Sequence, residues 1–292
     1  MSQASSRIAH TLTRLALAVG CAAALPSAFA ATDCAQPGGA GATPNRTVIG
    51  LTADQALVGF KACRPDRQQT LGTVSGLGGA DTALVGIDFR VQDGLLYGLG
   101  NGGGVYTIDP ATAIATKASQ LSVALEGTRF AIDFNPAANA LRIISDSGQN
   151  LRHPFANPEP RTTFVDPALN YTPGSAATGI VGIGYTNNDL DANTATTLVD
   201  IDASLNQVVL QAPANNGSLV PAGKLGVDPE APVGFDIHSR KVGGVVTANV
   251  GFASMNVGGQ AGFYRVDLLT GHATLLGTLP QALVDVAVTL DP

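Results

Sequence analysis

The sequence predicts an all-β protein: a single five-bladed β-propeller whose ring is closed by the C-terminal strand pairing into the first blade. Three observations support this prediction. A short motif recurs at nearly constant spacing, and β-branched runs alternate with turn-forming Gly, Pro, Asn and Asp. The motif is also missing at the start of the chain and present at its end. We expect the propeller to span residues 47–292.

The recurring motif is an apolar pentapeptide whose fourth position is usually aspartate. Its copies are residues 85–89, 130–134, 181–185, 233–237 and, more loosely, 284–286. The fourth position falls at residues 88, 133, 184, 236 and 285, so the spacings are 45, 51, 52 and 49. A repeat of this length is typical of a four-stranded propeller blade. We interpret each copy as the inner strand of one blade.

The strands around these copies can be placed individually. The second blade is the plainest, with strands predicted near residues 84–90, 94–99, 104–109 and 114–118. The first blade has strand-like runs at residues 48–52, 57–62 and 70–74, and no copy of the motif precedes them. The run at residues 284–290 therefore supplies the missing inner strand and closes the ring. A large β-sandwich with chance internal similarity is the alternative.

Residues 1–30 have the organisation of a secretory signal peptide. Arg7 and Arg14 precede a short apolar run, and Ala28-Phe29-Ala30 provides small residues at the −3 and −1 positions of a cleavage site. The run is too short to span a membrane, and we expect no membrane span elsewhere. Export to the periplasm or the extracellular space follows from this prediction. A buried helix and lipoprotein processing at Cys21 are the alternatives.

Removing the signal peptide changes the formal charge from −6 to −8, because it takes away two arginines and no acidic residue. An acidic chain has no basic surplus for binding phosphates, so nucleic acid is excluded as an expected partner. A Gly- and Pro-rich arm follows at residues 31–46. Two cysteines then remain, Cys34 and Cys63, and in an oxidising compartment we expect them to form a disulfide. The bridge would contribute roughly 3 to 4 kcal/mol by constraining the unfolded chain.

Several stretches resemble an uncharacterised family of secreted bacterial proteins, known as a domain of unknown function with a propeller-like repeat. The stretches that carry the resemblance include residues 86–99, 106–110, 134–142, 145–152 and 197–202. The resemblance covers roughly residues 45 to 290 and implies a β-propeller fold. It implies no activity and no catalytic residues.

The sharpest candidate site is a calcium site in a loop rich in oxygen side chains. Its ligands would be Asp189, Asp191, Asn193 and Asp200, at positions 1, 3, 5 and 12 of the loop. Two departures weaken it: Thr194 replaces the glycine of the helix–loop–helix version, and an aspartate replaces the bidentate glutamate. The surrounding alternation also indicates a strand. A solvated acidic turn is the alternative interpretation.

The aspartates of the inner strands are a second candidate for chemistry. Asp88, Asp133, Asp236 and Asp285 would recur around the central channel, where they could hold a metal ion or act as paired carboxylates. Repetition at equivalent positions favours a structural role instead, in which each carboxylate binds backbone donors. His153 is the best single candidate among the histidines. The absence of tryptophan argues against sugar and quinone sites.

No catalytic motif stands out, so the sequence leans away from an enzyme and favours a binding or scaffold module. Two long segments rich in Pro, Asn and Gly, residues 152–178 and 211–232, are predicted to be rim loops that recognise a partner. The partner would be an unidentified protein or small molecule. The alternative is a calcium-assisted hydrolase or lyase with its site at the mouth of the channel.

Overall fold

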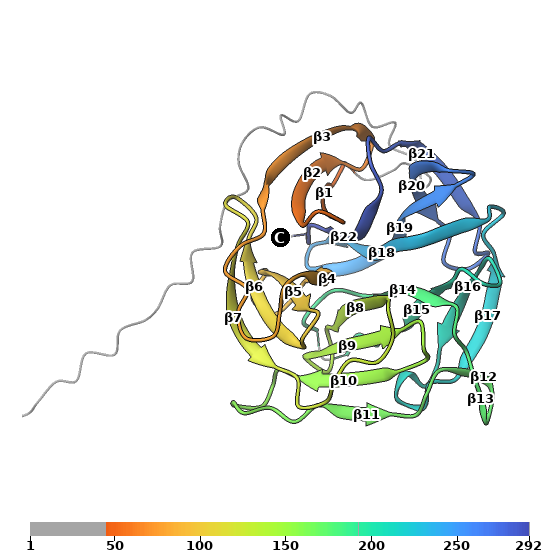
Figure 1. The fold of residues 1–292 in the computed structure, drawn as a ribbon. Helices are drawn as coiled ribbons and strands as arrows, with labels where there is room; N and C mark the ends of the chain where they lie inside the picture. The colour runs from red at the N-terminus through yellow and green to blue at the C-terminus, as the bar shows by residue number, and fades with distance from the viewer. Residues whose placement is uncertain (1–44, 192, 292) are drawn as a thin grey trace, which may run out of the picture.

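The computed structural model describes residues 45–191 and 193–291, and these form five four-stranded antiparallel sheets arranged in a ring (Figure 1). Blade 1 contains β22 (Leu283–Val288), β1 (Thr47–Thr52), β2 (Ala56–Lys61) and β3 (Arg64–Thr73). Blade 2 contains β4 (Leu84–Phe89), β5 (Leu96–Gly100), β6 (Gly104–Asp109) and β7 (Ile114–Gln120). Blade 3 contains β8 (Phe130–Asn135), β9 (Ala140–Ser145), β10 (Asn150–Pro154) and β11 (Phe164–Asp166). Blade 4 contains β14 (Ile180–Tyr185), β15 (Leu198–Asp202), β16 (Gln207–Gln211) and β17 (Leu219–Lys224). Blade 5 contains β18 (Pro229–Val242), β19 (Val245–Val257), β20 (Gln260–Val266) and β21 (Ala273–Thr278).

The ring is closed by the last strand, as the sequence predicts. β22 pairs antiparallel with β1, with Val48 opposite Val288 and Gly50 opposite Val286. Blade 1 therefore combines the last strand of the propeller, β22, with its first three strands, β1 to β3. This pairing leaves no open inner edge between blades 5 and 1. The predicted five-bladed propeller is confirmed.

The hydrophobic core lies between the blades, in five clusters of buried side chains, one for each pair of neighbouring blades. Blade 4 shows how this arises. Val199 and Ile201 of β15 pack toward blade 5, whereas Leu198 of the same strand packs toward blade 3. Because side chains alternate along a strand, both faces of each blade are buried, and the inner strands become almost continuously apolar.

The closing seam between blades 5 and 1 is filled by aromatic rings. Phe60 of β2 meets Phe263 of β20 edge-on, with 5.1 Å between ring centroids. Phe252 of β19 stacks on Phe263 at 5.6 Å. These large apolar contacts make the seam that joins the two ends of the propeller a packed core like the others.

The strands of blade 2 begin and end within a few residues of their predicted positions, but two predicted loops contain strands. The segment 152–178 includes β11, the outer strand of blade 3, and a short hairpin of β12 (Asn170–Thr172) and β13 (Ser175–Ala176). The segment 211–232 includes a 3-10 turn at Ala214–Asn216 and β17, the outer strand of blade 4. Outer strands are half-exposed, so their sequences lack the apolar alternation that marks inner ones.

The signal peptide at residues 1–30 and most of the arm at residues 31–46 lie outside the described residues. Cys34 lies there too, so its pairing with Cys63 remains a prediction. Among residues 45–191 and 193–291, no helix is long and apolar enough to cross a membrane.

Candidate functional site

Three buried carboxylates from different blades converge inside the ring. One carboxylate oxygen from each of Asp88, Asp133 and Asp236 lies within 4.8 Å of the others. They come from the inner strands β4, β8 and β18. Among the described acidic, histidine and cysteine side chains, this is the group of three whose spacing would suit a metal ion.

Each of these carboxylates also accepts a hydrogen bond from the backbone of the inner strand of the next blade. Asp88 accepts a hydrogen bond from the backbone N–H of Phe134 at 2.7 Å, and Asp133 accepts one from Tyr185 at 3.2 Å. Asp236 accepts one from Val288 at 2.6 Å. The repeated aspartates therefore bridge neighbouring blades, which is the structural role that repetition favours.

Asp285 does not occupy the same level of the channel. Asp88 accepts a hydrogen bond from the backbone N–H of Phe134, the residue directly after Asp133. Asp236 accepts one from the backbone N–H of Val288, which lies three residues after Asp285. Ala287 therefore holds the equivalent position in β22, and the alignment of Asp285 with the other aspartates is shifted by two residues. Asp285 lies on the same face and accepts from Ile87 N at 2.9 Å.

The clustering changes the acidity of these groups. Burial raises the pKa of Asp88 and of Asp133 well above the usual value, and neighbouring carboxylates raise it further. Burial raises the pKa of Asp236 to about 6, although its hydrogen bonds from the backbone oppose the shift. Three carboxylates this close cannot all carry an uncompensated charge, so the group holds protons or a cation.

The structure does not bring the four predicted calcium ligands together. Asp189 and Asp191 form a turn in the β14–β15 loop, where Asp189 Oδ1 accepts from Asp191 N and Asp191 Oδ1 accepts from Asn193 N, both at 2.9 Å. This loop docks on blade 5, since Asn188 N donates to Ser239 Oγ at 2.9 Å. Among the described residues, Asp200 does not converge with these carboxylates.

Asp200 instead faces the seam between blades 3 and 4. It alternates with Val199 and Ile201, which face blade 5, so its side chain lies on the other face of β15. It is fully buried, and neither carboxylate oxygen has a hydrogen-bond partner among the described residues. Burial raises its pKa well above the usual value, while the nearby Arg142 opposes that shift.

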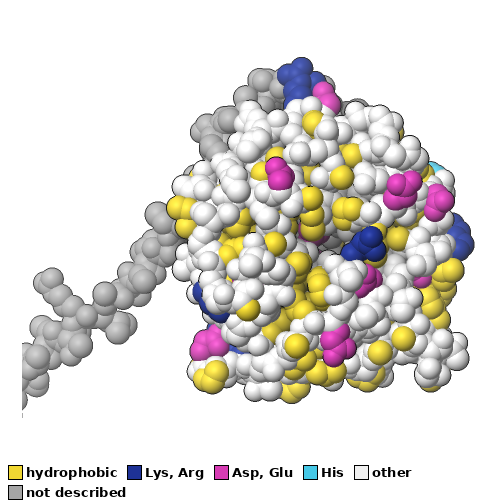
Figure 2. Space-filling model, in the orientation of Figure 1, with side chains coloured by type: hydrophobic (Ala, Val, Ile, Leu, Met, Phe, Trp, Pro, Cys, Tyr) yellow, Lys and Arg dark blue, Asp and Glu magenta, His cyan; other side chains and the backbone are white. Residues whose placement is uncertain are grey.

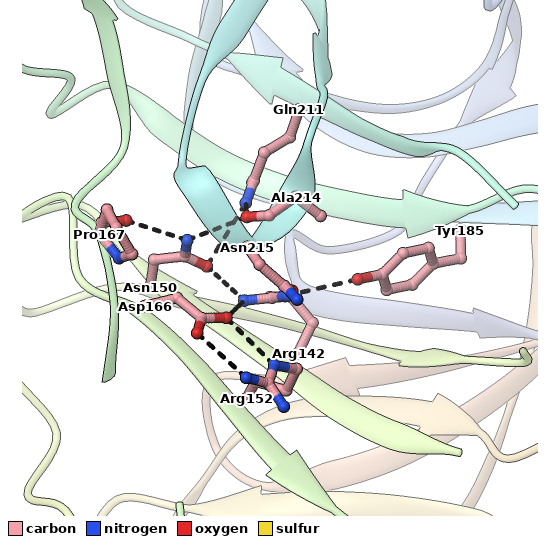
Figure 3. Close-up of polar contacts among 9 residues, drawn as sticks. All are labelled: Arg142, Asn150, Arg152, Asp166, Pro167, Tyr185, Gln211, Ala214 and Asn215. Carbon is pink, nitrogen blue, oxygen red and sulfur yellow. Dashed lines mark hydrogen bonds and ion pairs between the residues drawn. The ribbon is translucent and has the colours of Figure 1, made fainter. Parts of the chain in front are cut away.

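Arg142 is the centre of a polar network in that seam (Figure 3). The side chain is 2% exposed. Its Nη1 donates to Asp166 Oδ2 at 2.7 Å and to Asn150 Oδ1 at 2.8 Å, both in blade 3. On the blade 4 side, Nη2 donates to Asn215 Oδ1 at 2.5 Å, and Nε donates to Tyr185 Oη at 3.4 Å. One guanidinium thus joins two blades through four partners.

The two predicted recognition segments lie side by side at the outer edge of the same seam (Figure 1). Asn170 and Ser218 form an isolated parallel bridge between them. They enclose a cavity of about 440 Å³, the seam cavity, lined by Pro167, Ala168, Asn170, Pro173, Gly174, Ser175, Ala176, Asn216 and Ser218. The lining consists of small side chains, polar side chains and two prolines.

His153 is part of the packing rather than of an open site. It is buried in β10, with Ser119 Oγ 2.8 Å from Nε2 and Thr163 Oγ1 3.0 Å from Nδ1. Burial lowers its pKa to about 4, and the charge on Arg161 adds to the shift. Both ring nitrogens already have partners, so the imidazole is neutral and fixed at neutral pH.

A larger cavity of about 830 Å³ lies between blade 2 and the segment that follows β22, the strand that closes the ring. Its walls come from blade 2, from the segment that follows β22, and from Lys241 at the end of β18; we call it the closure cavity. The lining residues are Phe89, Val91, Gly94, Leu95, Leu96, Thr107, Ile108, Asp109, Pro110, Thr112, Ile114, Thr116, Lys241, Thr289, Leu290 and Asp291.

Strand register explains the apolar wall of the closure cavity. Phe89 pairs with Leu96, and Leu96 pairs with Ile108, so the three side chains form a row across one end of blade 2. On the blade 1 side, the lining residues come from the segment 289–291 and not from β1, β2 or β3. Phe89, Leu96 and Ile108 also belong to the core cluster in which blade 1 packs against blade 2, so they form the buried base of the cavity.

Sequence patterns give no sign of the closure cavity. It forms between segments far apart in the chain, and none of its residues belongs to a motif with a chemical meaning. The surface gives little help, because on the face drawn in Figure 2 acidic and basic side chains are scattered, in several places next to each other, among uncharged ones. A patch of one sign that would indicate a charged partner is not visible on that face.

Residues 56–287 match the family described as a domain of unknown function, DUF4394. The match covers most of the chain, so this protein belongs to that family. No curated protein matches the chain significantly.

Two of the solved structures that are similar to the chain can be named. One is an auxiliary nutrient binding protein from Bacteroides thetaiotaomicron, with 14% sequence identity, a TM-score of 0.41 and coverage of 70% of this chain. The chain spans 55% of the length of that protein. The other is a protein from Lactobacillus plantarum, with 18% identity, a TM-score of 0.37, and coverage of 80% of this chain and 67% of that one.

Proposed function

We propose that this protein is an exported binding module that takes a small molecule in the closure cavity. The observation that supports the proposal is the cavity itself, about 830 Å³ in volume and walled mainly by apolar side chains with a few polar groups. This size and composition are typical of small-molecule sites. Export to the periplasm or the extracellular space is part of the proposal and depends on the signal peptide predicted at residues 1–30.

The closure cavity is a better candidate than the seam cavity. The seam cavity has about half the volume, and no large aliphatic or aromatic side chain lines it. A ligand gains most from a site that removes apolar area from water and supplies a few polar partners. We therefore assign the outer segments around Asn170 and Ser218 to the packing of blades 3 and 4.

The competing proposal is a calcium-assisted hydrolase or lyase. The convergence of Asp88, Asp133 and Asp236 favours it, because carboxylate oxygens are the ligands that calcium prefers. Against it, these carboxylates already accept backbone hydrogen bonds that hold the blades together. A binding module needs no such ion, and we therefore prefer the binding module to the calcium-assisted enzyme.

The binding function can be tested with a library of small acids, alcohols, amino acids and sugars. Native mass spectrometry would detect members that bind in a 1:1 complex. Ile114 lines the cavity and is 52% exposed, so Ile114→Trp should obstruct it. Leu275 on β21 is equally exposed and lies outside the cavity, which makes Leu275→Trp a matched control.

We expect at least one library member to bind the wild type and Leu275→Trp but not Ile114→Trp. The proposal is rejected if no member binds, or if every complex survives in the Ile114→Trp variant.

A further inference from the structure

We propose that the ligand of the closure cavity is a small organic acid: one carboxylate or sulfonate carried on an apolar body, with its acid group bound by Lys241. This inference rests on the proposed binding function and names the chemical class of its ligand. It follows from two properties of the cavity, its apolar wall and the state of the charged groups that line it.

The apolar wall defines the body of the ligand. Phe89, Leu96 and Ile108 stand in register across blade 2, and Leu290 faces the same cavity from the segment after β22. These side chains offer no hydrogen bonds. A sugar or an amino acid would place polar edges against side chains that cannot pair with them, which costs free energy. An alkyl chain or a simple ring would lose nothing there.

Both carboxylates that line the cavity are already engaged. Asp109 Oδ1 accepts from Ala111 N, and its Oδ2 accepts from Thr112 Oγ1, both at 2.9 Å. Asp291 forms an ion pair with Arg46 and accepts from the backbone N–H of Lys241 at 2.8 Å. Neither carboxylate is left to recruit a cationic ligand.

Lys241 is the charged group of the cavity that remains available. Its backbone N–H is bound to Asp291, but its ammonium has no hydrogen-bond or ion-pair partner among the residues that the structure describes. An unpaired cation at the edge of an apolar cavity is complementary to an acid on an apolar body. An ammonium also accepts any oxyanion geometry, since it acts as a point charge.

The test compares decanoate with 1-decanol, which share an alkyl chain and differ in the head group. Isothermal titration calorimetry at pH 7.5 would give their affinities for the wild type, for Lys241→Met and for Lys241→Arg. We expect the wild type to bind decanoate about tenfold more tightly than 1-decanol. Lys241→Met should remove this preference and Lys241→Arg should retain it. Added salt should weaken the preference, because Lys241 is only half-buried.

Lys117→Met is the control for losing a lysine from the surface. Lys117 lies on β7 of the wall-forming blade, outside the cavity, and contacts Gln120. Lys117→Met should leave the affinities for decanoate and for 1-decanol unchanged. Melting curves of each variant would confirm that it is folded.

The outcomes separate this inference from the function on which it rests. If both probes bind the wild type equally and Ile114→Trp blocks both, the cavity binds ligands but the organic-acid class is wrong. The assignment of the acid group to Lys241 is also wrong if decanoate is preferred and Lys241→Met keeps the preference. If neither probe binds, the acid class is overturned, and the library experiment then decides the fate of the binding function.

Discussion

At the scale of single residues, burial decides which titratable groups can take part in chemistry. His153 is enclosed between Ser119 and Thr163, and its pKa of about 4 keeps it neutral at neutral pH. A fixed neutral imidazole with both nitrogens bonded is a packing element. The same burial makes His153 a source of acid sensitivity, because its imidazole is protonated at a higher pH in the unfolded chain than in the folded protein.

We predict that His153→Gln reduces the loss of stability in acid. The folded pKa of about 4 lies below the usual 6.5, so the wild type loses stability as the pH falls from about 6.5 toward 4. Glutamine places a neutral hydrogen-bonding group near the position of Nε2 and gains no charge in acid. Urea denaturation at pH 7 and pH 4.5 should show this loss reduced by about 1–3 kcal/mol.

The exposed His272→Gln is the control and should keep the wild-type pH dependence. Part of the acid sensitivity should remain in both variants, because burial also lowers the pKa of His238 to about 4. Identical pH profiles for wild type and His153→Gln would contradict the prediction.

Arg142 shows how much residue-level information the sequence contains. Arg142, Asn150 and Arg152 fall in the stretches by which the chain resembles its family, yet their spacing does not indicate that they meet. The structure places Arg142 and Asn150 on adjacent strands and brings Asn215 from the next blade. A convergence that depends on two blades and their seam cannot be obtained from local patterns.

We predict that Arg142→Met destabilises the protein by about 2–4 kcal/mol, because it leaves the buried carboxylate of Asp166 with Arg152 as its remaining cation and takes the donor from Asn150 and Asn215. Chemical denaturation would measure the change. Arg129→Met should change stability by no more than about 0.5 kcal/mol, since Arg129 is exposed and lies 4.0 Å from Asp146. Equal effects of the two substitutions would show that the network contributes little.

At the scale of elements, the sequence predicts inner strands better than outer ones. The strands of blade 2 match their predicted ranges closely because each alternates or is continuously apolar. β3 and β17 are only partly predictable, because both are half-exposed edge strands that contain a proline, Pro65 and Pro221 respectively. Proline is tolerated at a sheet edge, where no ladder bond is lost, so its presence there does not end a strand.

The inner strands are linked to each other by aspartates, and this linkage depends on pH. The pKa of Asp236, about 6, lies above its usual 3.8, so the folded state holds a proton that the unfolded state releases. Stability is therefore lost as the pH rises from about 4 to about 6. Asp236→Asn removes this titration, although it also weakens one of the two backbone hydrogen bonds.

We predict that raising the pH from 4 to 7 lowers the unfolding free energy of the wild type by about 1–3 kcal/mol relative to that of Asp236→Asn. Denaturation at several pH values would measure it. Asp146→Asn should show no such shift: burial raises the pKa of that carboxyl, but hydrogen bonds from Thr128 outweigh burial and hold it below its usual value. A constant difference across this range would contradict the prediction.

At the scale of the whole molecule, the number of blades and the closure of the ring are predictable because both depend on a repeat. The five copies of the motif form β4, β8, β14, β18 and β22, and each blade buries both faces against its neighbours. The closure cavity is not predictable, because it depends on how the segment after the last strand lies against blade 2.

The whole ring also provides the test between the binding module and the calcium-dependent enzyme. In our proposal the channel carboxylates are compensated by protons and by backbone N–H groups, so millimolar calcium or a chelator should leave the melting temperature unchanged. A calcium site would instead stabilise the protein by about 4 kcal/mol at a thousandfold excess over its dissociation constant. Differential scanning calorimetry at pH 7.5 measures either result. A calcium-dependent rise that Asp236→Asn abolishes would place the ion in the channel, whereas a rise that only Asp189→Asn abolishes would place it in the β14–β15 loop. Either rise would favour the calcium-assisted enzyme over the binding module.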